Sequence, residues 1–120
     1  MHENFIKDDL QSILESIELI EIRFVNIKQP ENFVLNNEGT LILDAISMRL
    51  QIIGELLKKV NKEDSSLFTR YSNIEWEKIM RLRDIISHHY DIIDHEIIYD
   101  ICSNHIIPLK ANVQKIIDEL

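Results

Sequence analysis

Apolar residues recur along this chain at alternating steps of four and three, which places side chains on one face of an α-helix. The segment KQPENFVLNNEG, residues 28–39, then gathers a proline, asparagines and a glycine, which break helices or favour turns. We therefore predict a long helix over residues 4–27 followed by a long loop. The apolar positions of that helix are Ile6, Leu10, Ile13, Ile17, Ile20, Phe24 and Ile27.

A second helix is predicted from about residue 40 to residue 60, with Thr40 as its N-cap. It carries two adjacent apolar stripes, a wider arc than one neighbouring helix covers. We therefore expect this helix either at the centre of a bundle or at a subunit interface, and we favour the interface. The first stripe is Leu41, Ala45, Met48, Ile52, Leu56 and Val60, and the second is Ile42, Ile46, Leu50, Ile53 and Leu57.

Two more helical regions are predicted in the second half of the chain. One begins near Ser72, whose side chain can cap it while Glu75 completes a capping box. The other begins after Asp94, also an N-cap, and continues to the last residue with a kink or restart at Pro108. We predict an all-α fold, in which residues 1–120 form a single domain built as an up-and-down bundle of four to five helices.

Composition and charge narrow the function. The chain has only two glycines and two prolines and is 45% hydrophobic, which favours a packed helical protein. Its net charge of −8 opposes non-specific attraction to nucleic acid or anionic lipid, so any RNA binding must be local. The single cysteine, Cys102, excludes an intramolecular disulfide and is expected to be a buried free thiol. Without a leader-like or membrane-spanning apolar run, the protein is predicted to be cytoplasmic, with no membrane contact.

The stretch RLRDIISHHY, residues 81–90, carries most of the candidate chemistry. At about 100° per residue, Arg83 and Tyr90 share one helix face, whereas Arg83 and His88 point about 140° apart. They converge on one ligand if the helix breaks near residues 87–89, if Arg83 reaches around, or if a two-fold axis brings a second copy alongside. The third option agrees with the surplus apolar stripe of the second helix.

These residue types suit cleavage of RNA without a metal ion. An arginine offers a permanently charged fork for phosphate oxygens, and a histidine that titrates near neutrality can move the proton of a 2′-hydroxyl or leaving oxygen. Asp84 can orient His88 or stabilise its charged form. The alternative is a solvated helix face, on which Lys78, Arg81 and Arg83 form salt bridges with the acidic residues between them.

A metal site is the competing interpretation of the histidines. His88, His89, His95 and Glu96 do not form an H-E-x-x-H motif, so we predict no metal and no cofactor. His105 lies on the apolar line of the last helix and is expected to be a satisfied core histidine. Two tyrosines are expected to be packing residues: Tyr71 and Tyr99.

Together these segments resemble a known family. The run RDIISHHY resembles the R-x4-6-H signature of the HEPN superfamily and, as R-x4-H-x-Y, is similar to the HepT toxins of HepT/MntA toxin–antitoxin systems. LDAISMRLQIIGELLKKV resembles the second-helix segment of that family, and the run from Trp76 to Arg83 resembles the approach to its active helix. The resemblance covers most of the chain, roughly residues 5–118.

The resemblance implies a helical bundle that forms a homodimer and cleaves RNA in a cleft between subunits, leaving 2′,3′-cyclic phosphate ends. Arg83 would contact the scissile phosphate and His88 would transfer the proton. Asp84 would occupy the polar position after the arginine, with Ser87 and His89 as further supporting residues. Aspartate stands here where asparagine is commoner in the family, and His89, where a small residue is commoner, competes with His88 for the catalytic role.

The resemblance also implies a partner. In type VII toxin–antitoxin systems of this kind, a minimal nucleotidyltransferase antitoxin, MntA-like, transfers AMP to the motif tyrosine, which is Tyr90 here. AMP would add bulk and negative charge where an RNA phosphate must sit, and would thereby inhibit the toxin. The alternative is a non-catalytic subunit that binds a nucleotide or substrate for a nucleotidyltransferase, an interpretation that the acidic net charge favours.

Overall fold

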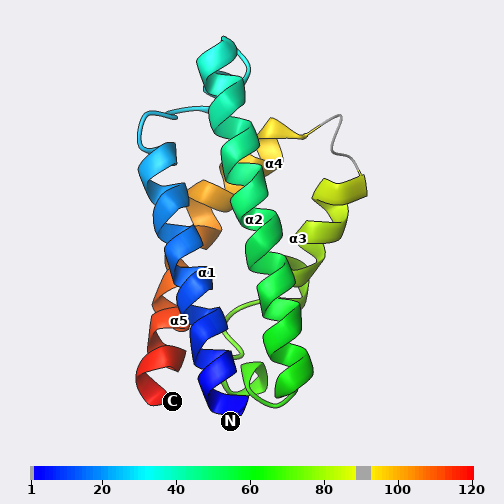
Figure 1. The fold of residues 1–120 in the computed structure, drawn as a ribbon. Helices are drawn as coiled ribbons and strands as arrows, with labels where there is room; N and C mark the ends of the chain where they lie inside the picture. Colours follow the sequence, from blue (N-terminus) through cyan, green and yellow to red (C-terminus); the bar gives the residue numbers. More distant parts are fainter. Residues whose placement is uncertain (1, 89–92) are drawn as a thin grey trace.

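Helices make up all of the regular structure in the described part of the chain, the backbone of residues 2–88 and 93–120. In this computed structural model the long helices run alternately up and down, which confirms the predicted all-α bundle of four to five helices (Figure 1). They are α1 (His2–Phe24), α2 (Asn37–Glu63), α3 (Trp76–His88), α4 (His95–Asp100) and α5 (Ile106–Glu119). Between them lie the 3₁₀ helices η1 (Pro30–Phe33) and η2 (Phe68–Arg70) and the π-helix η3 (Ile101–His105).

The core lies where α1 packs against α2 and α5. The α1 side chains that face it recur every three or four residues, as the apolar spacing predicts, and four of them are 0% exposed. Burying a side chain of this kind contributes about 1.5–3 kcal/mol, so this seam supplies much of the stability. The fully buried members from α1 are Leu10, Ile13, Ile17 and Ile20, and those from α5 are Val113 and Ile116.

Helix α2 begins earlier than the sequence predicts, so the prediction that Thr40 is its N-cap is wrong. Asn36 is the N-cap, and its side-chain oxygen accepts a 2.8 Å hydrogen bond from the backbone N–H of Gly39. Gly39 does not end the loop but lies in the first helical turn, against η1, where an added Cβ would lie 2.1 Å from the carbonyl oxygen of Asn32. The predicted loop is therefore shorter, and it contains η1 with the buried ring of Phe33.

The two apolar stripes of α2 differ in how far they are buried. Four members of the second stripe, Ile46, Leu50, Ile53 and Leu57, enter the core. Much of the first stripe faces outward: Leu41 is 62% exposed and Met48 is 52% exposed, while Ala45, Ile52 and Leu56 are half-buried. Within the described residues, α2 thus packs against α1 and α3 and still presents an apolar stripe to solvent.

Helix α3 begins at Trp76, so the prediction that Ser72 caps it is wrong. The backbone N–H groups of Lys78 and Ile79 bond to the carbonyl of Glu75, and the residues before it form a turn. The indole of Trp76 stacks on Phe68 with ring centroids 4.4 Å apart and donates a 2.9 Å hydrogen bond to the carbonyl of Tyr71. The connector therefore determines where α3 starts.

The last helical region confirms two predictions. Asp94 caps α4, accepting hydrogen bonds from the backbone N–H groups of Glu96 and Ile97. Pro108 lies in the first turn of α5, just after η3. Because a proline ring clashes with the carbonyl four residues earlier, the wider π turn, with an Ile106 N–H to Ile101 carbonyl bond, accommodates it.

The π turn also overturns the prediction for His105. His105 lies inside this turn, where the helix is not a regular α-helix, whereas Leu109, Val113 and Ile116 after it are buried. The His105 side chain is 60% exposed, with Nε2 3.4 Å from Asp100 Oδ2, so His105 is not a core histidine.

Candidate functional site

The predicted site residues belong to the carboxyl half of α3, which points away from the end of the molecule that holds the C-terminus (Figure 1). The helix includes Arg83, Asp84, Ser87 and His88 in its backbone, and the structure describes the side chain of Asp84. It therefore does not test how the other side chains converge. The predictions that fall outside the described residues or side chains concern Arg83, Ser87, His88, His89 and Tyr90.

The side chain of Asp84 is paired with a lysine on the neighbouring helix α2. Lys58 Nζ lies 3.0 Å from Asp84 Oδ2, and the two side chains are 39% and 46% exposed. Lys58 was not predicted as a site residue, because the sequence gives no sign that residues 26 positions apart pair with each other. Only the packing of α2 on α3 brings this ammonium beside the residue that follows Arg83.

The basic residues earlier on α3 are paired along the helix, as predicted for a salt-bridged face. Lys78 lies 2.8 Å from Glu75, and Arg81 lies 3.2 Å from Glu77. The hydrogen bond from Lys78 lowers the pKa of Glu75. These pairs are exposed, so they add little stability.

A groove of about 580 Å³ lies beside the same helix, between α3 and the segment α4–η3–α5. It borders the exposed side of α3, with the Lys78 and Arg81 side chains at its edge. Its apolar lining consists of Ile74, Ile79, Leu82, Ile97, Ile101 and Pro108.

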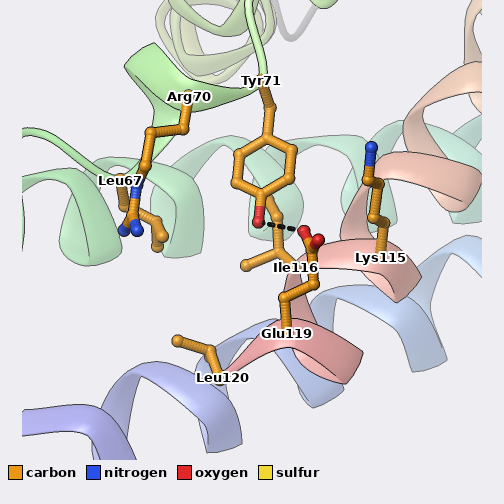
Figure 2. Close-up of a pocket in the computed structure, with 7 residues that line it drawn as sticks. All are labelled: Leu67, Arg70, Tyr71, Lys115, Ile116, Glu119 and Leu120. Atoms are coloured by element: carbon orange, nitrogen blue, oxygen red, sulfur yellow. Dashed lines mark hydrogen bonds between the residues drawn. The ribbon is translucent and has the colours of Figure 1, made fainter.

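A smaller pocket of about 350 Å³ lies where the α2–α3 connector meets the end of α5, and it contains no predicted site residue (Figure 2). The hydroxyl of Tyr71 donates a 2.5 Å hydrogen bond to Glu119, which raises the pKa of Tyr71. Lys115 Nζ lies 5.9 Å from the centroid of the Tyr71 ring. Because the hydroxyl of Tyr71 on the connector is bonded to Glu119 on α5, this pocket ties the connector to α5. Tyr99 packs on Phe24, as expected, and donates to the carbonyl of Lys28.

Other chemistry is sparse in the described part of the chain. Cys102 is a buried free thiol, as predicted, and burial raises its pKa to about 12, which makes it a poor nucleophile. The described residues contain no group of three or more His, Cys, Asp or Glu able to hold a metal ion. Over the same residues, every helix is too short or too polar to cross a bilayer.

Comparison with known proteins establishes the family. The family model "Ribonuclease HepT-like" matches residues 13–116. "Probable ribonuclease HepT" of Thermococcus cleftensis is 30% identical over 110 residues, which cover 92% of this chain and 94% of the relative. A "Putative RNase" of Methanocaldococcus jannaschii is 30% identical over 111 residues, covering 92% of this chain and 86% of the relative. The chain belongs to the HepT-like ribonuclease family, which confirms the resemblance.

A further relative is much longer. "Gamma-glutamylcyclotransferase and putative RNase" of M. jannaschii is 32% identical over 115 residues, covering 96% of this chain. The match covers 49% of that relative, so this chain spans about half its length. No solved structure gives a significant match.

Proposed function

We propose that this chain is the toxin of a type VII toxin–antitoxin system, an endoribonuclease that acts without a metal ion. The observation that carries the proposal is the R-x4-H-x-Y sequence of a chain in the HepT-like ribonuclease family, with Arg83 and His88 on α3. Asp84, Ser87 and His89 support these two residues in the proposed site.

The proposed reaction needs only the chain's own groups and the RNA. The guanidinium of Arg83 binds the scissile phosphate and stabilises the charge that develops on it. As the 2′-hydroxyl loses its proton, its oxygen attacks phosphorus, the bond to the 5′-oxygen breaks, and that oxygen gains a proton. His88 provides proton transfer in this step. The products are a 2′,3′-cyclic phosphate and a 5′-hydroxyl.

We propose a homodimer as the active form. The exposed stripe of α2, including Leu41 and Met48, supports this proposal because an apolar stripe of that kind is suited to burial against a second copy. The helical spacing of Arg83 and His88, about 140° apart, also favours a site completed by two subunits.

Inhibition is proposed to act at Tyr90. A minimal nucleotidyltransferase antitoxin transfers AMP from ATP to its hydroxyl, releasing pyrophosphate, and the added phosphate repels RNA from the site. Incubation with such an antitoxin and ATP should attach AMP to the wild type, as located by mass spectrometry, and stop RNA cleavage. Tyr90→Phe should remain unmodified and active, and AMP found on another residue would refute this step.

Substitution on α3 tests the catalytic assignment. Arg83→Ala and His88→Ala should each lower the rate of RNA cleavage about 10²- to 10⁴-fold without changing the unfolding temperature, because each removes one proposed catalytic group. Arg81→Ala is the matched control, since it removes a neighbouring arginine that is paired with Glu77. Equal losses in Arg81→Ala and Arg83→Ala would refute the specific role of Arg83.

The second candidate is a non-catalytic subunit that binds a nucleotide or substrate for a nucleotidyltransferase. The net charge of −8 favours it, because RNA must overcome long-range repulsion. Cleavage of RNA by the isolated protein, abolished in Arg83→Ala, separates the ribonuclease from the binding subunit.

A further inference from the structure

The ion pair between Lys58 and Asp84 involves the residue that directly follows the proposed phosphate-binding arginine in the chain. Lys58 is on α2, Asp84 is on α3, and their charged atoms are 3.0 Å apart. Asp84 follows Arg83 in the chain, so its carboxylate is attached to the same helical turn as the guanidinium. The site therefore contains a negative charge close to where an RNA phosphate is proposed to bind.

Without the ammonium of Lys58, the carboxylate of Asp84 would oppose RNA binding more strongly, in two ways. It would repel the phosphate, since unit charges less than about 10 Å apart interact appreciably even near a protein surface. It would also attract the guanidinium of Arg83 and so compete with the phosphate for it. An ammonium at hydrogen-bond distance offsets the charge and draws the carboxylate toward α2.

We propose that Lys58 is a positioning residue of the ribonuclease site, which holds and neutralises Asp84 so that Arg83 stays available for RNA phosphate. This inference rests on the proposed function. It assigns to Lys58 an effect that passes through Asp84, and it gives Lys58 no direct contact with RNA.

A second ion pair provides a matched control. Lys110 on α5 and Glu21 on α1 are 2.8 Å apart, with side chains 39% and 35% exposed, close to the 39% and 46% of Lys58 and Asp84. Half-exposed pairs of this kind contribute little to stability, so Lys58→Ala and Lys110→Ala should both fold. Any difference in RNA cleavage between the two variants then comes from the position of the Lys58–Asp84 pair next to the proposed site.

The test is steady-state cleavage of a short RNA at low salt. Lys58→Ala should raise KM about three- to tenfold and change kcat less, whereas Lys110→Ala should leave both within about twofold of wild type. The rise should shrink at 0.5 M salt, because exposed charges are then screened. Lys58→Arg should keep KM near the wild-type value, since it retains a cation beside Asp84.

A double-mutant cycle separates an effect through Asp84 from direct contact with RNA. In an Asp84→Asn background, Lys58→Ala should no longer raise KM, because no carboxylate remains to be neutralised. An equal rise in both backgrounds would overturn the proposal and indicate that Lys58 touches RNA. Equal behaviour of Lys58→Ala and Lys110→Ala would overturn it as well.

RNA binding gives a readout that does not depend on turnover. Fluorescence anisotropy with a His88→Ala protein should show weaker RNA binding when Lys58→Ala is added. If wild type cleaves RNA and Arg83→Ala does not, the proposed function stands whatever the Lys58 variants show. A wild-type protein that neither binds nor cleaves RNA would overturn both proposals.

Discussion

The seam between α1, α2 and α5 and the outer helix α3 are held in different ways. On α1, the side chains of Ile13, Ile17 and Ile20 are completely buried. On α3, Trp76, Met80 and Ile86 are buried but keep 6–9% of their surface exposed. In the described part of the chain α2 is the main helical neighbour of α3, and the groove of about 580 Å³ lies along its other side.

This difference indicates how the fold separates stability from chemistry. Closely packed apolar side chains hold the central seam, whereas α3 has one packed side and is oriented by particular polar contacts at its start and middle. Those contacts are the Trp76 indole on the Tyr71 carbonyl and Lys58 on Asp84. A helix held in this way can present charged groups to a substrate, and it opens at a lower cost than the central helices.

The largest expected loss of stability comes from truncating a buried side chain of the central seam. Ile17→Ala should lower the free energy of unfolding by about 3–4 kcal/mol, because the void is enclosed on all sides. Ile86→Ala removes the same atoms from α3 and should cost about 2 kcal/mol, because this side chain is 9% exposed and water can enter the void. Urea unfolding measures both values, and an equal or larger loss for Ile86→Ala would contradict the comparison.

A smaller effect is expected where α2 begins. Gly39→Ala should lower the free energy of unfolding by about 2 kcal/mol, since the new methyl group meets the Asn32 carbonyl and η1 must move away from α2. Thr40→Ala, one residue further on, should change it by less than about 1 kcal/mol, because Thr40 is not the N-cap. A stabilised Gly39→Ala protein would show that helix propensity outweighs the close approach.

Local signals made much of the fold predictable from sequence. Apolar spacing placed the buried side chains of α1, and the carboxylate of Asp94 placed the start of α4. The same signals did not decide between Asn36 and Thr40, because both residue types cap helices well. The close approach of Gly39 to the Asn32 carbonyl joins α2 to η1 and accompanies a helix that starts after Asn36. Local apolar spacing contains no sign of this contact.

For the candidate site, the family resemblance assigned the motif, and α3 contains the backbone of Arg83 and His88. Helix periodicity contains no information on which residues of two neighbouring helices lie side by side. Lys58 was therefore missed, although it lies 3.0 Å from Asp84. His105 was misplaced for a related reason, since the prediction assumed a regular α-helix through η3. The convergence of Arg83 and His88 stays a prediction.

The smallest effect is expected at the pocket of Figure 2, which ties the connector before α3 to α5. Tyr71→Phe removes the hydrogen bond to Glu119 and should cost about 0.5–1 kcal/mol at pH 8. The bond raises the pKa of Tyr71, so the folded protein holds this proton more tightly than the unfolded chain does. Its contribution is complete below the unfolded pKa of about 10 and is lost as pH rises through the folded value.

Wild type and Tyr71→Phe should therefore converge in stability between pH 8 and pH 11 in urea unfolding. Glu119→Gln tests the cause, because its amide oxygen still accepts the hydrogen bond but carries no charge to oppose ionisation of the phenol. That variant should lose less stability than wild type over the same range. A gap between wild type and Tyr71→Phe that stays constant with pH would mean that the tie between the connector and α5 does not depend on this proton.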